Sequence, residues 1–239
     1  MSEESRNVLI AGATPRCGKT VACAGIAGVL LDLGFKVQAT RPLVFDQNIA
    51  PGEICVDQAY MELIEANRVM QRLETVVVPS PYDLSALLWN RMLENCKKPV
   101  YPLLIESTGS VAQPLRVEED GFFDVLDLSD TLDAAIVLVG RKSPDVVAEL
   151  APALTYLYDG DADVLGWIAV ETQAFDLPRW EQDYQLVSRE YDVPFLGEIA
   201  WSPSISVEGL QQGNLLKLTE ASLDLLPIQQ AMNLALAAH

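Results

Sequence analysis

The feature that most constrains this chain is a glycine-rich segment between a strand-like and a helix-like stretch. Residues 7–11 form a short apolar run typical of a buried strand, and residues 20–33 are apolar at helical spacing. Between them, residues 12–20 read Gly-Ala-Thr-Pro-Arg-Cys-Gly-Lys-Thr. A turn of this kind leaves backbone N–H groups pointing inward at the positive end of a helix, where they attract phosphate. The sequence therefore predicts a phosphate-binding loop.

The loop is a variant of the common spacing G-x-x-x-x-G-K-[ST], because Ala13 stands where that pattern has glycine and Gly12 comes one residue early. We expect Lys19 to reach the β- and γ-phosphates of a nucleotide and Thr20 to bind Mg²⁺. An ordinary strand–helix turn with an exposed lysine is the alternative, and the flanking strand, the helix and Gly12 argue against it. The expected nucleotide-binding residues here are Gly12, Ala13, Thr14, Pro15, Arg16, Cys17, Gly18, Lys19, Thr20 and Val21.

The composition limits the partners of the chain. Its 239 residues include 34 acidic and 16 basic side chains, which gives a formal net charge of −18. Such a charge repels nucleic acid and anionic lipid, so we expect neither as a partner, while Arg16 and Lys19 make the loop a local positive site. No apolar run is long enough to cross a bilayer, and the acidic amino terminus is unlike a signal peptide, so we expect a cytoplasmic protein.

The cysteine and histidine content excludes two kinds of site. The four cysteines show no C-x-x-C spacing, and the only histidine is His239. A zinc site or a histidine-based catalytic triad is therefore not expected. Cys17 lies inside the loop, where we interpret it as a small filler rather than a nucleophile.

Strand-like and helix-like segments alternate along the chain, which predicts an α/β protein: a three-layer P-loop NTPase fold with a mainly parallel central sheet flanked by helices. Nothing marks a linker, so we expect one domain over residues 1–239. The helix of residues 20–33 is expected to end at Gly34. Expected strands are 7–11, 36–40, 76–78, 101–105, 134–139, 165–170 and 194–199, and expected helices are 20–33, 57–73, 84–96, 144–158, 178–191 and 215–238.

These segments, taken in order, resemble the dethiobiotin synthetase family over most of the chain. The family loop has the form G-T-x-T-x-x-G-K-T, and residues 12–20 share its five-residue gap between glycines. Further similarities are the Lys-Pro-Val strand end at Arg41-Pro42-Leu43, a helix-opening aspartate at Asp57, the Pro-x-Ser-Pro segment at 79–81, the V-E-G-A-G-G loop at 105–110, the strand before the base site at 166–169 and the Leu-Gly-Glu-Ile strand end at 196–199.

The resemblance implies an ATP- and Mg²⁺-dependent ligase. Family enzymes carboxylate an amine of 7,8-diaminopelargonic acid with CO₂, phosphorylate the carbamate from ATP and close a ureido ring, a step of biotin biosynthesis. It also implies a homodimer. Carried onto this chain, it assigns catalysis to Lys19 and Arg41, Mg²⁺ to Thr20, Asp57 and Glu106, base recognition to Val170 and Glu171, and substrate binding to Arg41, Phe45, Ser107, Thr108, Gly109 and Ser110.

The departures from the family pattern fall mainly in its substrate half and its base site. Arg41 replaces a lysine, Phe45 a small serine, residues 107–110 a glycine-rich loop, and Val170-Glu171 an Asn-Asp pair. A nucleotide-sensing regulatory module of the same fold is therefore the alternative to a ligase. The related partitioning ATPases carry a signature lysine early in the loop, where this chain has Thr14. We do not expect that function.

Overall fold

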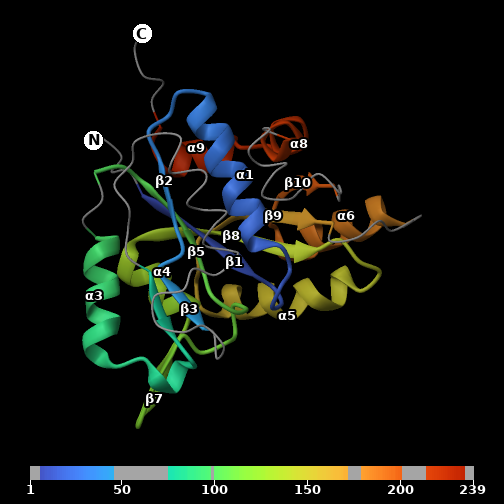
Figure 1. Cartoon of the computed structure of the whole chain (residues 1–239). Coiled ribbons are helices and arrows are strands. Elements are labelled where there is room, and N and C mark those ends of the chain that lie inside the picture. Colours follow the sequence, from blue (N-terminus) through green and yellow to red (C-terminus); the bar gives the residue numbers. More distant parts are fainter. Residues whose placement is uncertain (1–5, 46–74, 98–99, 172–178, 201–213, 235–239) are drawn as a thin grey trace.

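A six-stranded parallel sheet forms the centre of the molecule (Figure 1). The computed structural model describes residues 6–45, 75–97, 100–171, 179–200 and 214–234. The strand order of the six-stranded sheet is β10-β9-β8-β1-β5-β2, and every neighbouring pair is parallel. The strands are β1 (Asn7–Gly12), β2 (Gln38–Thr40), β5 (Leu103–Glu106), β8 (Ala134–Arg141), β9 (Val164–Val170) and β10 (Phe195–Ile199).

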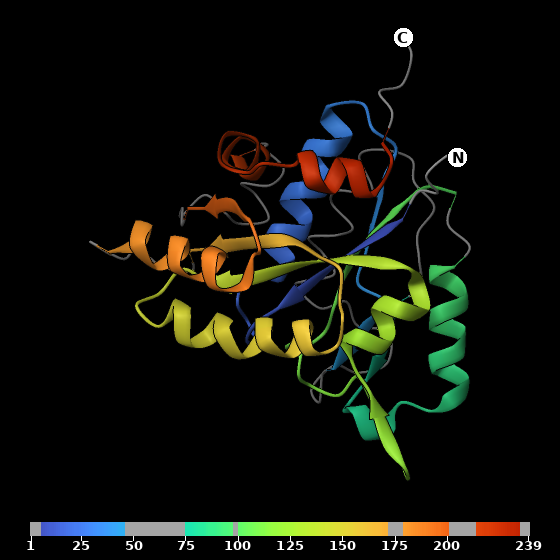
Figure 2. The same ribbon diagram turned by 180° about the vertical axis from the view of Figure 1, so that it is seen from behind.

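Helices cover both faces of this sheet (Figures 1 and 2). One face carries α1 (Lys19–Asp32), α8 (Asn214–Ser222) and α9 (Leu226–Ala231). The other carries α3 (Ala86–Cys96), α4 (Val125–Leu132), α5 (Val146–Asp159) and α6 (Trp180–Tyr191). The predicted three-layer α/β fold is confirmed.

The alternation of side chains along β1 explains why the molecule has two hydrophobic cores, one on each face of the sheet. Val8 and Ile10 pack in the core on the α1 side, while Leu9 and Ala11 pack in the core on the α5 side. Successive side chains of a strand point to opposite faces, so a strand covered on both sides is apolar throughout. This is why the central strands read as continuous apolar runs in the sequence.

Gly34 caps the carboxyl end of α1, as predicted. Gly34 has φ +88°, its N–H donates to the Leu31 carbonyl at 3.0 Å, and the Phe35 N–H donates to the Leu30 carbonyl at 3.0 Å. This pair of bonds is a Schellman motif, whose left-handed residue favours glycine.

The expected carboxyl-terminal helix is wrong as a single element. The chain leaves α8 after Ser222 and starts α9 at Leu226. Between them Leu223 forms a bridge with Gly197 of β10, and the Asp224 N–H donates to the Leu196 carbonyl at 2.7 Å. Pairing with the sheet thus interrupts the apolar helical pattern. The expected helix 57–73 and residues 235–238 lie outside the described residues.

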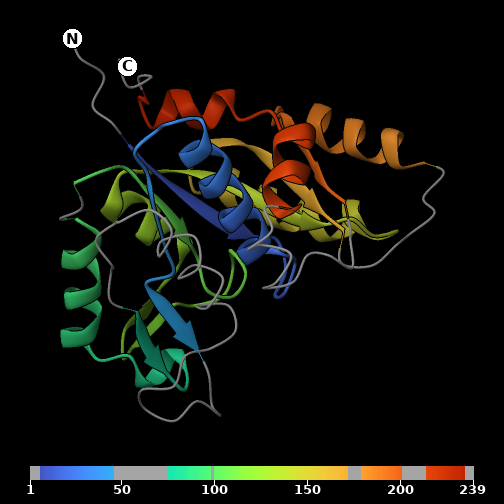
Figure 3. The same cartoon turned by 45° about the horizontal axis from the view of Figure 1, so that its top comes forward.

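Several elements had no counterpart in the prediction. β3 (Leu43–Phe45) is one of them, and it pairs in parallel with β4 (Val76–Val78), which confirms the predicted strand 76–78. Figure 3 shows this small blue and teal sheet apart from the large one. β6 (Arg116–Glu118) and β7 (Gly121–Phe123) form a hairpin, and η1 (Pro81–Asp83) is a short 3₁₀ turn. No helix within the described ranges is long and apolar enough to span a bilayer.

Candidate functional site

The segment between β1 and α1 is anchored by backbone hydrogen bonds on two sides. The Ala13 N–H donates to the Val139 carbonyl of β8, and the Val111 N–H donates to the Gly12 carbonyl, both at 2.9 Å. Within the segment, Arg16 has φ +58° and Gly18 has φ +101°. These left-handed residues turn the chain sharply into the amino terminus of α1, the arrangement expected of a phosphate-binding loop.

Gly18 is required here for two reasons. Its φ of +101° disfavours any side chain, and a Cβ would lie 2.5 Å from Val170 Cγ1. Val170 is only 3% exposed. The residue assigned to base recognition therefore supports the loop from below as part of the core.

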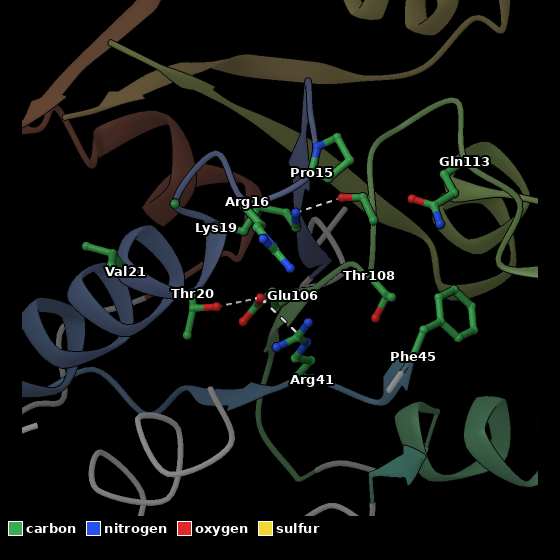
Figure 4. Close-up of a pocket in the computed structure, with 12 residues that line it drawn as sticks. Pro15, Arg16, Lys19, Thr20, Val21, Arg41, Phe45, Glu106, Thr108 and Gln113 are labelled. Atoms are coloured by element: carbon green, nitrogen blue, oxygen red, sulfur yellow. Dashed lines mark hydrogen bonds and ion pairs between the residues drawn. The ribbon is translucent and has the colours of Figure 1, made fainter. Parts of the chain in front are cut away.

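Lys19 lies across the loop (Figure 4). Its Nζ donates to the Gly109 carbonyl at 2.7 Å, and the residue is 6% exposed. Gly109, with φ +72°, belongs to the turn after β5. A buried ammonium with a carbonyl partner is held ready for an anion, because the carbonyl satisfies only one of its three donors.

Glu106, the last residue of β5, lies between Thr20 and Arg41 (Figure 4). Thr20 Oγ1 donates to Glu106 Oε1 at 2.7 Å, and Arg41 Nε is 3.6 Å from the same oxygen. The Glu106 side chain is 1% exposed and that of Arg41 is 14% exposed. A positive charge and a hydrogen-bond donor offset the loss of hydration of a carboxylate this deeply buried, and Arg41 and Thr20 supply them.

These groups line one cavity of about 390 Å³. Among its described lining residues the cations Arg16, Lys19 and Arg41 outnumber the single acid, Glu106. The cavity is therefore locally positive in a chain of net charge −18. Its lining comes from the loop and α1, from the β2–β3 segment and from the turn after β5: Pro15, Arg16, Gly18, Lys19, Thr20, Val21, Arg41, Phe45, Glu106, Thr108, Gly109 and Gln113.

Other predicted site residues lie away from this lining. Thr14 Oγ1 donates to Glu149 Oε2 at 3.5 Å, and Cys17 is buried beneath the loop. Burial raises the pKa of the Cys17 thiol, against a lowering effect of Lys19, which suits a filler rather than a nucleophile. Ser107 is 1% exposed, and neither it nor Ser110 is among the residues that line the cavity. Asp57 lies outside the described residues.

The chemistry of the donors fits Mg²⁺. Thr20 and Glu106 supply a hydroxyl and a carboxylate, the hard oxygen ligands that Mg²⁺ takes alongside phosphates and water. The described residues contain no cluster of three or more His, Cys, Asp or Glu side chains that would bind a metal without a nucleotide. Thr20 and Glu106 are thus suited to hold a metal that arrives with phosphate.

Sequence reasoning missed Gln113 and an ion-pair cluster beside Glu171. Lys142 Nζ lies 3.8 Å from Glu171 Oε1 and 3.1 Å from Glu198 Oε1, while Trp180 Nε1 donates to Glu198 Oε2 at 2.6 Å. Lys142 and Glu171 follow β8 and β9, and the carboxyl ends of parallel strands share one edge of a sheet. That rule was the available signal for Lys142. Gln113 sits in an irregular loop and had none.

Comparison with known proteins agrees with this geometry. A family model described as an AAA domain, AAA_26, matches residues 6–208. A search of the curated proteins finds no match. Among solved structures, a chain of the MinC:MinD cell division protein complex of Aquifex aeolicus has a TM-score of 0.52 at 16% identity, covering 95% of this chain and 93% of that one.

A ParA family ATPase from Chlorobium tepidum TLS has a TM-score of 0.52 at 12% identity, covering 96% of this chain and 97% of that one. At these identities the two structures share the fold of this chain, and the likeness carries no specific activity to it. The family match is of another kind, because it spans most of the chain and includes the phosphate loop, Glu106 and the cavity lining. The chain therefore belongs to the AAA_26 family of AAA domains, and it is a P-loop nucleotide-binding domain.

Proposed function

We propose that this domain binds ATP with Mg²⁺ and uses it as a ligase of the dethiobiotin synthetase type. The observation that carries the proposal is that one cavity is lined by the loop lysine Lys19 together with Arg41, Phe45 and Gln113. A domain that only binds phosphate needs the loop. A phosphoryl-transfer enzyme also needs room for an acceptor beside the γ-phosphate, and these residues wall such a space.

The nucleotide half of the mechanism follows from the loop. Its N–H groups and Lys19 would bind the phosphates, and Thr20 and Glu106 would hold Mg²⁺, with Asp57 a third candidate from the family resemblance. Bound Mg²⁺ neutralises charge on the phosphate oxygens during transfer. We place the base near Glu171, beyond Val170 and at the carboxyl end of β9.

The acceptor half uses side chains from separate segments. By the resemblance, an amine takes up CO₂ as a carbamate, a carbamate oxygen attacks the γ-phosphorus, and ADP leaves. The second amine then displaces phosphate and closes a ring. Arg41 is placed to stabilise the negative charge of the carbamate, while Phe45 and Gln113 shape the space around it.

A product assay with ATP, Mg²⁺, bicarbonate and diaminopelargonic acid tests this function. Arg41 and Phe45 are two of the departures that line the cavity, and we expect them to displace the acceptor. A displacement of about an ångström costs on the order of a hundredfold in rate. We expect weak dethiobiotin formation by the wild type and more by the double variant Arg41→Lys, Phe45→Ser. A Ser107→Gly variant serves as a control, because Ser107 does not line the cavity.

A nucleotide-sensing module is the second candidate, and one observation favours it. Arg41 Nε lies 3.6 Å from Oε1 of Glu106, the carboxylate that we propose for the metal. If nucleotide binds but neither the wild type nor the double variant forms ADP in response to any added amine, the ligase proposal is overturned in favour of a sensor. ADP formation that depends on an amine substrate excludes the sensor.

A further inference from the structure

The contact between Arg41 and Glu106 is set by the register of the central sheet. β2 pairs in parallel with β5, with Gln38 opposite Leu103, Ala39 opposite Leu104 and Thr40 opposite Ile105. The next pair in this register is Arg41 and Glu106, which lie just past and at the carboxyl ends of the two strands. The register therefore brings the backbones of Arg41 and Glu106 side by side, which places their side chains within reach of each other.

Thr20 and Arg41 both approach the same oxygen of Glu106. Glu106 Oε1 accepts from Thr20 Oγ1 at 2.7 Å and faces Arg41 Nε at 3.6 Å. Thr20 and Glu106 are also the pair whose chemistry fits Mg²⁺. A guanidinium within ion-pair distance lowers the affinity of a carboxylate for any other cation, as it does for a proton.

We propose that Arg41 is a built-in counter-ion of Glu106 that competes with Mg²⁺ for this carboxylate and so sets how strongly nucleotide binding depends on the metal. The inference rests on the proposed binding of MgATP at this loop. Without metal, Arg41 balances the buried charge of Glu106, so that nucleotide phosphate does not meet an uncompensated carboxylate. With metal bound, Glu106 is shared between the metal and Arg41, and the guanidinium of Arg41 turns toward the phosphate or the acceptor in the same cavity.

A purely structural ion pair makes a different prediction. Removing a structural partner destabilises the fold and lowers all affinities together, because it leaves a buried charge alone. Competition instead changes the coupling between metal and nucleotide, and this coupling is reciprocal: the factor by which metal improves nucleotide binding equals the factor by which nucleotide improves metal binding.

The test measures Mn²⁺ binding, as a probe for Mg²⁺, from the electron paramagnetic resonance signal of the free ion at saturating non-hydrolysable ATP analogue. In Arg41→Gln we expect Mn²⁺ to bind about tenfold tighter than in the wild type, at the lower end of what a neighbouring arginine does to the proton affinity of a carboxylate. The metal-free analogue should bind more weakly. Arg16→Gln is the matched control, since Arg16 lines the same cavity but is exposed and forms no ion pair with Glu106 within the described part of the chain.

A double-mutant cycle with Glu106→Gln completes the test. In that background Arg41→Gln should no longer tighten Mn²⁺ binding, because the contested carboxylate is gone. Equal Mn²⁺ affinity in wild type and Arg41→Gln, or equal tightening by Arg16→Gln, overturns the competition. If Arg41→Gln fails to fold, Arg41→Lys replaces it with an expected intermediate shift, and an unchanged affinity there overturns the inference as well. A wild type that binds no analogue with or without metal overturns the proposed function itself, which is a distinct result.

Discussion

The two sides of the cavity are built in different ways. The phosphate-loop side comes from the contiguous residues 12–21 and is fixed by backbone hydrogen bonds to Val139 and from Val111. The acceptor side brings together Arg41, Phe45, Thr108 and Gln113 from separate segments, and side chains define its shape. The first side therefore tolerates little change, while the second can change with the sheet intact. The departures from the dethiobiotin synthetase pattern fall mainly on the second side.

The largest effect on nucleotide binding is expected on the loop side, from Lys19→Ala. Lys19 is 6% exposed and faces the cavity, so its loss removes a charge-assisted contact to desolvated phosphate. Nucleotide binding should weaken by about 2–4 kcal/mol, measured by calorimetry. Lys36→Ala is the control, because Lys36 is exposed and stacks over Tyr101 outside the cavity. Equal affinity of wild type and Lys19→Ala would show that phosphate does not bind at this loop.

A second effect on the same side concerns its backbone. Gly18→Ala meets both a φ of +101° and Val170 Cγ1 at 2.5 Å, whereas Gly34→Ala meets a φ of +88° with no atom within 4 Å. Gly34→Ala should lower the free energy of unfolding by about 1–2 kcal/mol. Gly18→Ala should cost about 1–3 kcal/mol more because of the overlap. Chemical denaturation compares the two, and equal losses would mean that Val170 moves away without cost.

On the acceptor side the loss of folding stability should be smaller, and nucleotide affinity should stay nearly unchanged. Thr108 Oγ1 donates to the Leu43 carbonyl and so ties β3 to the turn after β5. Thr108→Val leaves this buried carbonyl without its donor, which lowers the free energy of unfolding by about 1–3 kcal/mol. Thr108→Ser keeps the hydroxyl and should be close to wild type. Nucleotide affinity should change less than twofold in both variants. A large change would show that the acceptor side of the cavity also determines nucleotide binding.

A last effect, which appears only at alkaline pH, should lie away from both sides, in α3. Burial raises the pKa of the Cys96 thiol from 9.0 to about 12. The folded thiol stays protonated while the unfolded one ionises, so this contribution to stability is full below pH 9 and is lost as the pH rises toward 12. The wild type should therefore lose more unfolding free energy between pH 9 and pH 11 than Cys96→Ala. Parallel losses would show that Cys96 is open to solvent.

The comparison of the two sides also explains what the sequence could predict. The loop, α1 and the apolar strands were predictable because each depends on neighbouring residues: the strand–glycine–helix order, the Gly34 cap and runs of Val, Ile and Leu. α4 also has a local signal in the sequence, a capping box formed by Asp124 and Asp127. The break between α8 and α9 at Leu223 had no local signal in the sequence, because pairing with Gly197 interrupts a segment whose apolar residues have helical spacing.

The acceptor side was predictable only through resemblance. It identified Arg41, Phe45, Thr108 and Gly109, which do line the cavity, and also Ser107 and Ser110, which do not. Gln113 and the contact of Arg41 with Glu106 depend on how distant segments meet. The register of β2 on β5 brings these two residues together, and a strand as short as the three residues of β2 gives no register in the sequence.

Hydrogen exchange read by mass spectrometry, with and without MgATP analogue, tests whether nucleotide binds at the phosphate loop. Bound nucleotide should slow exchange at residues 13–20 and 106–109 on the two sides of the cavity. It should cause no change around a second cavity of about 410 Å³, lined by Lys97, Tyr101 and Asp133 among others, at the amino-terminal ends of β1 and β5. Protection confined to that second cavity, or no protection under conditions where calorimetry reports binding, would contradict a nucleotide site at the phosphate loop.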